Sequence, residues 1–170
     1  MNKAFDDSAL RKHAERLADL LLERNMTLST AESCTGGWIG KACTDLSGSS
    51  GWYLGSIVSY SNAAKVRLLQ VPERQLLEHG AVSQPVAERM AWGAMEALGS
   101  QLSLAVTGIA GPDGGSVDKP VGTVWFAWAD AQHVRSEKRV FEGDRDQVRR
   151  QTVAVALDGL CDRVAANGRF

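Results

Sequence analysis

Ser33 and Cys34 place two nucleophilic groups side by side, at the point where an apolar segment gives way to Gly36 and Gly37. A hydroxyl or a thiol at such a turn can attack a carbonyl carbon when a base accepts its proton. We expect a strand to end and a helix to begin here, so that free N–H groups at the helix start can stabilise an oxyanion or hold a phosphate. The pattern predicts acyl-transfer chemistry or the binding of a phosphorylated ligand.

The base that such a nucleophile needs is less evident in the sequence. None of the three histidines is well placed to serve. Lys65 is the alternative, because burial or a neighbouring cation lowers the pKa of a lysine amine until it can act as a general base. Tyr60 lies five residues earlier and could relay or orient the proton. A solvated lysine on a helix and a strand tyrosine with a hydrated hydroxyl are the other interpretations of these two residues.

The nucleophile itself also has alternatives. Serine and threonine often cap helices, so capping alone would account for Ser33 or Thr35. Cys34 is a rival nucleophile, but a reactive thiol needs a cation or a comparable field to lower its pKa. Glu32 is a capping or hydrogen-bonding carboxylate whose role stays open at this point.

Two further loops, at residues 47–51 and 107–115, are rich in glycine and hydroxyl groups. In the second loop, Thr107 and the repeated glycines would let backbone donors approach a ligand closely, although an ordinary wide turn has the same composition. Arg145 opens the last predicted helix, where a cation opposes the local dipole. This placement indicates a phosphate or carboxylate partner, and an exposed arginine without a ligand is the alternative.

Hydrophobic periodicity predicts the elements that must position these residues. We expect helices at 10–21, 38–46 and 62–69, a helical turn at 72–80, a helix that begins at 83–85, and a last helix that a capping box of Asp144 and Gln147 opens. We expect strands at 26–30, 53–60 and 102–106, and a hairpin of 121–129 with 134–141. The alternation predicts an α/β fold, a three-layer sandwich whose mixed β-sheet is covered by helices.

Composition limits the classes of function. A chain of 170 residues with 44% hydrophobic content can bury roughly two thirds of its surface, so we expect one domain over residues 1–170. The 19 basic and 20 acidic residues are interspersed, which predicts no nucleic-acid and no membrane partner. The three cysteines, the absence of an apolar leader and the lack of a spanning segment predict a cytoplasmic protein. Cysteine and histidine spacing matches no metal motif, so no metal is expected.

Several ordered motifs resemble the CinA C-terminal domain family of competence/damage-inducible proteins, and within it the stand-alone nicotinamide mononucleotide amidohydrolases. The resemblance runs from about residue 27 to the final helix. Its motifs are AESCTGG at 31–37, a serine- and glycine-rich segment at 47–52, SYSNAAK at 59–65, HGAVSQPVAERMA at 79–91, TGIAGPDGGSVDKPVGTVWFA at 107–127 and GDRDQVRRQ at 143–151.

The resemblance implies hydrolysis of the carboxamide of nicotinamide mononucleotide to nicotinate mononucleotide and ammonia, in the pyridine nucleotide cycle, without a cofactor. It implies Ser33 as the nucleophile and Lys65 as the general base, supported by Tyr60. We also expect a homo-oligomer. The residues that the resemblance and the loops together suggest for substrate binding are Glu32, Thr35, Gly36, Gly37, Thr107, Gly108, Ala110, Gly111 and Arg145.

Two other functions remain open from the sequence. The same loops and Arg145 would suit a non-catalytic module that binds a mononucleotide. Alternatively, Cys34 would be the nucleophile of a cysteine hydrolase, which would be sensitive to alkylation.

Overall fold

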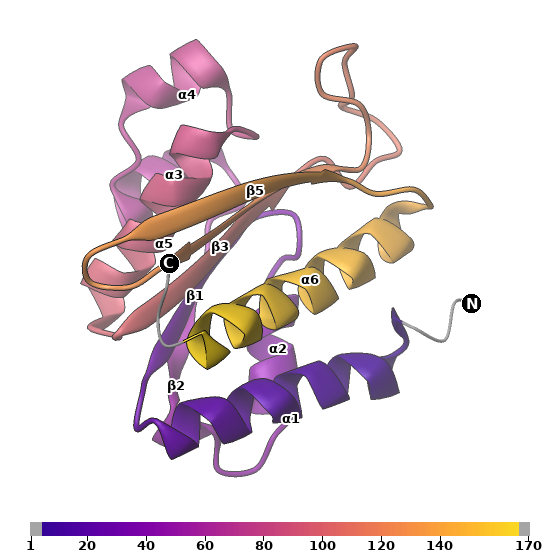
Figure 1. Cartoon of the computed structure of the whole chain (residues 1–170). Coiled ribbons are helices and arrows are strands. Elements are labelled where there is room, and N and C mark those ends of the chain that lie inside the picture. The colour runs from indigo at the N-terminus through magenta and orange to yellow at the C-terminus, as the bar shows by residue number, and fades with distance from the viewer. Residues whose placement is uncertain (1–4, 167–170) are drawn as a thin grey trace.

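Five strands form one mixed sheet in the computed structural model, which describes residues 5–166 (Figure 1). The strand order is β2-β1-β3-β4-β5, with β1 parallel to both of its neighbours and β4 antiparallel to β3 and β5. The mixed sheet and the late hairpin of the prediction are therefore confirmed. The strands are β1 (Leu28–Glu32), β2 (Tyr53–Val58), β3 (Leu102–Gly108), β4 (Thr123–Ala129) and β5 (Val134–Val140).

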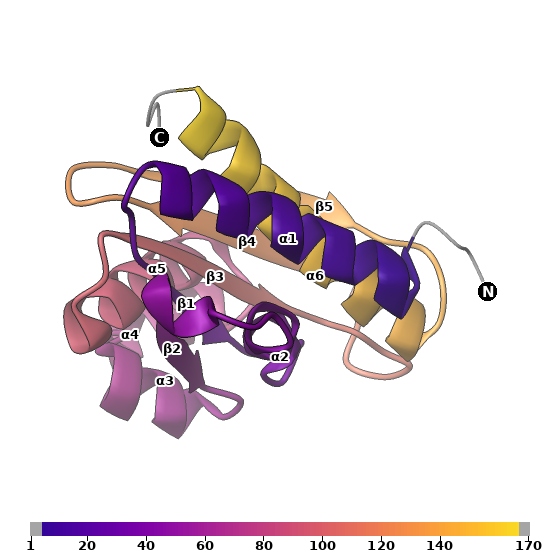
Figure 2. The same ribbon diagram turned by 90° about the horizontal axis from the view of Figure 1, so that it is seen from below.

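Helices cover both faces of this sheet, which confirms the predicted three layers. Helices α1 and α6 lie side by side on one face together with α2, and α3 and α4 lie on the opposite face with α5 (Figure 2). In the described part of the chain, no helix is both long and apolar enough to cross a bilayer. The helices are α1 (Asp7–Glu23), α2 (Trp38–Thr44), the short 3₁₀ helix η2 (Ser49–Gly51), α3 (Asn62–Leu69), α4 (Glu73–His79), α5 (Gln84–Leu98) and α6 (Arg145–Ala165).

The boundaries differ from the prediction where tertiary pairing decides them. Strand β1 continues past the predicted end at Thr30, because Ala31 and Glu32 pair with strands on both sides. The expected helical turn at 72–80 is the regular helix α4. The predicted capping box is confirmed: the Asp144 side chain accepts from the amide of Gln147, and the Gln147 side chain accepts from the amide of Asp144.

The topology gathers the predicted site residues at one edge of the sheet. Because β2, β1 and β3 are parallel, their carboxyl ends lie at the same edge, where ligands of open α/β sheets usually bind. Ser33 follows β1, Tyr60 lies just beyond β2, and Thr107 and Gly108 end β3. Strand β5 runs in the same direction as β3 and delivers the start of α6, with Arg145, to this edge.

The close packing of α5 against the end of α3 yields the first prediction. A Cβ atom at Gly93 would lie 2.3 Å from the carbonyl oxygen of Leu69. This oxygen belongs to the backbone, so it cannot move away unless the chain shifts. Gly93→Ala should therefore lower the free energy of unfolding by about 1–3 kcal/mol, although alanine is the better helix former. Urea denaturation measures this loss.

Gly51→Ala is the matched control, because its Cβ would meet nothing closer than 3.7 Å. This variant should keep the wild-type stability to within about 0.5 kcal/mol. Equal stability of the Gly93→Ala variant and the wild type would show that the two helices are not in close backbone contact.

Candidate active site

Ser33 and Lys65 form a hydrogen-bonded pair at the carboxyl edge of the sheet. Ser33 directly follows β1, and its amide donates to the carbonyl of Val106, which continues the ladder between β1 and β3. Lys65 lies on α3, and its Nζ is 3.0 Å from Ser33 Oγ. The two side chains are 32 residues apart in sequence and nearly covered, since Ser33 is 8% exposed and Lys65 only 1%.

The surroundings of Lys65 suit a neutral amine. Its Nζ lies 2.7 Å from the carbonyl oxygen of Ser59 and 3.4 Å from that of Tyr60, so all three of its oxygen partners are uncharged. Burial lowers the pKa of Lys65 from 10.5 to about 8. When the amine is neutral, its two N–H groups can donate to the two carbonyls, which leaves the lone pair to accept from the Ser33 hydroxyl.

Glu32 lies on the opposite side of the turn and is fully buried. Each of its carboxylate oxygens accepts hydrogen bonds from three groups. The donors to Oε2 are the Thr35 hydroxyl and the amides of Gly37 and Ile39, and the donors to Oε1 are the amide of Gly40 and the hydroxyls of Ser56 and Thr30. Glu32 therefore caps α2 and joins it to β1 and β2, and a contact between this residue and a substrate stays a prediction.

Glycines allow this cap to form. Gly37 adopts φ +95° and Gly36 φ +62°, so the chain turns sharply before α2 begins. At Gly40, a Cβ would lie 2.9 Å from the Tyr53 hydroxyl and 3.5 Å from Glu32 Oε1. Any larger residue at position 40 would disturb the carboxylate and its donors.

The cap changes one expectation. The first amides of α2 were expected to be free for an oxyanion or a phosphate, but those of Gly37, Ile39 and Gly40 already donate to Glu32. That expectation was wrong, because the protein supplies its own anion at this helix start. The amides of Cys34 and Thr35 do not belong to the cap.

Tyr60 contributes to the site through its backbone carbonyl and through its side chain, and a proton relay by its hydroxyl stays a prediction. Its backbone carbonyl lies near Lys65 Nζ, whereas its side chain is 63% exposed and its hydroxyl accepts from Arg145 at 3.2 Å. Arg145 also donates to the carbonyl oxygen of Gly111 at 2.7 Å. Tyr60, Arg145 and Gly111 therefore form a bridge between the segment after β2, the glycine-rich loop and α6.

Other residues of the glycine-rich loop make packing contacts. Thr107 is buried, and its hydroxyl donates to the carbonyl of Ala81. Gly108 is needed because a Cβ there would lie 2.7 Å from the Val124 side chain. Ala110 belongs to the hydrophobic core on the α6 face. The structure therefore gives Thr107 and Ala110 intramolecular partners, and their contact with a substrate stays a prediction.

The thiol next to Ser33 is unsuited to nucleophilic attack. Cys34 is 5% exposed, and burial raises the pKa of its thiol from 9.0 to about 12. At neutral pH such a thiol stays protonated and is a poor nucleophile. The arrangement therefore favours the Ser33 hydroxyl over the Cys34 thiol.

Arg149 joins the site although the sequence analysis did not single it out. Its guanidinium donates to the carbonyl of Cys34 at 3.1 Å and to that of Thr35 at 2.9 Å. Its position four residues after Arg145, one helical turn along α6, was the signal in the sequence. Arg149 also lines a groove of about 350 Å³ with residues 35–38, Lys41 and Asp146.

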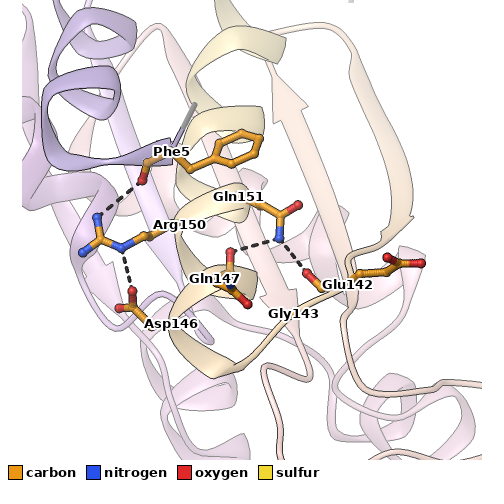
Figure 3. Close-up of a pocket in the computed structure, with 7 residues that line it drawn as sticks. All are labelled: Phe5, Glu142, Gly143, Asp146, Gln147, Arg150 and Gln151. Carbon is orange, nitrogen blue, oxygen red and sulfur yellow. Dashed lines mark hydrogen bonds and ion pairs between the residues drawn. The ribbon is translucent and has the colours of Figure 1, made fainter. Parts of the chain in front are cut away.

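A second hollow, of about 390 Å³, lies at the start of α6 near Phe5 (Figure 3). It is lined by Glu142 and Gly143 and by α6 residues other than Arg145 and Arg149. In neither hollow, nor elsewhere in residues 5–166, do three or more His, Cys, Asp or Glu side chains converge as metal ligands.

The fold and the site together define a class, an α/β protein in which a serine hydroxyl is hydrogen-bonded to a buried lysine amine. The sequence model of one family, described as the CinA C-terminal domain, matches residues 10–164. This chain belongs to the CinA C-terminal domain family, as its motifs predicted.

Known proteins of this family are similar over most of the chain. The nicotinamide-nucleotide amidohydrolase PncC of Pseudomonas putida is 56% identical over 147 residues, which are 86% of this chain and 92% of the relative. The protein of the same name from Escherichia coli K12 is 49% identical over 162 residues, or 95% and 98% of the two chains. The crystal structure of a CinA superfamily protein from Klebsiella pneumoniae matches with a TM-score of 0.90 at 34% identity, over 92% of this chain and 98% of that one.

The buried cap yields the second prediction. In Glu32→Gln, the new NH₂ group would face donors instead of accepting from them, so buried amides or hydroxyls would lose their acceptor. We expect the free energy of unfolding to fall by at least about 2 kcal/mol. Chemical denaturation monitored by circular dichroism measures it.

Glu15→Gln is the control for the loss of a carboxylate alone. Glu15 is exposed and pairs with Arg11 one helical turn away, so this change should cost less than about 0.5 kcal/mol. If the two variants were equally stable, the cap would not hold the turn.

Proposed function

We propose that this chain hydrolyses the carboxamide of nicotinamide mononucleotide to nicotinate mononucleotide and ammonia. The observation that carries the proposal is the 3.0 Å contact between Ser33 Oγ and the buried amine of Lys65. This contact supplies a nucleophile with an adjacent base, which is what cleavage of an amide requires. The name of the two curated relatives supports the choice of substrate.

In the first half of the reaction, neutral Lys65 accepts the hydroxyl proton while Ser33 Oγ attacks the carboxamide carbon. The tetrahedral intermediate collapses when its C–N bond breaks. The Lys65 ammonium returns the proton to the departing nitrogen, which leaves as ammonia, and Ser33 then carries a nicotinoyl ester.

In the second half, water attacks the ester carbon and Lys65 takes a proton from that water. The C–O bond to Ser33 breaks, the proton passes to Ser33 Oγ, and nicotinate mononucleotide leaves. The two carbonyls that hold Lys65 Nζ, those of Ser59 and Tyr60, keep the amine in place through both proton transfers. The same base thus serves acylation and deacylation.

Arg145 is the group that we assign to the phosphate of the nucleotide. Its guanidinium is held by the Gly111 carbonyl and the Tyr60 hydroxyl, and the residue stays exposed. A guanidinium has five N–H donors, so donors remain for phosphate oxygens. Through Tyr60, this cation is tied to the segment that also contacts Lys65.

The test is ammonia release from nicotinamide mononucleotide, with nicotinate mononucleotide identified by chromatography. We expect release by the wild type and by Cys34→Ala, and a loss of at least about 1,000-fold in Ser33→Ala, which lacks the nucleophile. Activity in Ser33→Ala with loss in Cys34→Ala would move the chemistry to the thiol. If the wild type binds the nucleotide without releasing ammonia, the chain is a binding module.

The pKa of Lys65 predicts the pH dependence. Below a pKa of about 8 the amine is protonated and cannot accept the Ser33 proton, so kcat/KM should rise about tenfold per pH unit and level off above it. Measurement of kcat/KM between about pH 6 and pH 9.5 checks this rise.

Lys65→Met is the matched variant, since it keeps the apolar stem and removes the amine. It should lower kcat by at least about 100-fold. A pH-independent kcat/KM in the wild type, or substantial turnover in Lys65→Met, would contradict the assignment of the base.

A further inference from the structure

Arg149 holds two consecutive carbonyl groups of the loop that follows Ser33. Its Nε donates to the carbonyl of Cys34 and its Nη2 to the carbonyl of Thr35, at 3.1 and 2.9 Å. The guanidinium also lies over the Trp38 ring, 5.0 Å from the centroid. A planar, bidentate cation of this kind fixes the orientation of both peptide groups.

The orientation of these carbonyls determines where the next amides point. In a trans peptide the C=O and N–H bonds point in opposite directions, so a Cys34 carbonyl that faces Arg149 turns the Thr35 N–H away from Arg149. The following peptide shows the effect directly. The Thr35 carbonyl faces Arg149, and the Gly36 N–H points the other way, where it donates to the carbonyl oxygen of Ser33 at 3.1 Å.

The Thr35 amide therefore points away from Arg149, as does the Gly36 amide, which meets the Ser33 carbonyl. Glu32 accepts from the amides of Gly37, Ile39 and Gly40, but from neither that of Cys34 nor that of Thr35. An oxyanion formed on attack by Ser33 needs N–H donors that are already in position. A guanidinium on the carbonyl side of a peptide also polarises it and strengthens its N–H as a donor.

We infer that Arg149 is a positioning residue, which sets the peptide between Cys34 and Thr35 so that the Thr35 N–H stabilises the oxyanion. The inference rests on the proposed hydrolysis by Ser33. It assigns oxyanion stabilisation to the loop before α2 rather than to the helix start. Arg149 itself touches no reacting atom and acts through the peptide group.

Arg150 provides the matched control. It is the next residue of α6, carries the same charge and lies over the same Trp38 ring at 4.8 Å. Its guanidinium instead contacts Asp146, Asp7 and the carbonyl of Phe5, two of which are visible in Figure 3. Loss of charge and of stacking on Trp38 is thus common to both arginines, whereas the contact with the loop that follows Ser33 is specific to Arg149.

The first experiment compares the steady-state kinetics of Arg149→Ala, Arg149→Lys and Arg150→Ala with nicotinamide mononucleotide. For Arg149→Ala we expect kcat to fall about 100-fold while KM changes less than about threefold, because the donor acts in the transition state. For Arg150→Ala we expect kcat within about threefold of the wild type. Millimolar guanidinium should restore part of the kcat of Arg149→Ala and none of that of Ser33→Ala.

Arg149→Lys keeps the charge and covers the case in which the alanine variant fails to fold. One ammonium cannot reproduce the bidentate contact, so kcat should fall at least about tenfold. Unchanged kcat in this variant, a rise in KM alone, or an equal loss of kcat in Arg150→Ala would overturn the positioning role.

A second readout does not depend on the substrate. A fluorophosphonate reacts at serine when Ser33 Oγ forms a bond to phosphorus, the P–F bond breaks, fluoride leaves and Lys65 takes the proton. The phosphoryl oxygen develops charge where the amide oxyanion would, so intact-mass labelling of Ser33 should slow at least about tenfold in Arg149→Ala and stay near wild type in Arg150→Ala.

The two readouts separate the two proposals. Labelling that depends on Arg149, together with no ammonia release by the wild type, would refute the substrate and leave the positioning role supported. Labelling of Arg149→Ala at the wild-type rate, or no labelling of Ser33 in the wild type, would overturn the positioning role whatever the activity on the nucleotide.

Discussion

The carboxylate of Glu32 is the constraint on which the arrangement of the site depends. It is fully buried at the end of β1, and a buried carboxylate is costly unless donors satisfy both oxygens. The hydroxyls of β1, β2 and the loop and the first amides of α2 all converge on it. Because successive strand residues point to opposite faces, a Glu32 side chain that faces α2 requires Ser33 to face α3 and Lys65. The cap thus orients the serine without contacting it.

Lys65 shows how a local cost becomes chemically useful. A buried amine beside uncharged oxygens loses hydration as an ammonium, and none of residues 5–166 gives Lys65 a carboxylate partner in return. The pKa of the Lys65 amine is therefore about 8, so in roughly one molecule in ten this amine is neutral at pH 7. Pairing Lys65 with an acidic residue would stabilise the charged form and raise the pKa again. The carbonyls of Ser59 and Tyr60 position the amine without that effect.

The fold and the pairing of Ser33 with Lys65 could be predicted from the sequence. The hydrogen-bond partners of the other polar groups could not. Apolar periodicity and capping signals predicted the mixed sheet, α3 and the start of α6, which bring Ser33, Lys65 and Arg145 to one edge. Side-chain direction depends on tertiary contacts instead. The Tyr60 hydroxyl accepts a hydrogen bond from Arg145 of α6, and the Thr107 hydroxyl donates to the carbonyl of Ala81. Both partners are far away in sequence, so neither contact follows from local spacing. The sequence shows Glu32 shortly before two glycines. It does not show how many groups donate to the carboxylate, because one of the donors lies on β2.

The arginines of helix α6 make different contacts because they lie at different angles around the helix axis. Arg145 and Arg149, four residues apart, reach from one side of the helix to the glycine-rich loop and to the Ser33 loop, whereas Arg150 turns to Asp146 and Asp7. The capping box at Asp144 fixes where the helix begins, and hence which residues occupy these angles. A shift of one residue in that start would rotate the side chains by about 100° and withdraw both arginines from the loops. Control of the site therefore extends to the cap of its last helix.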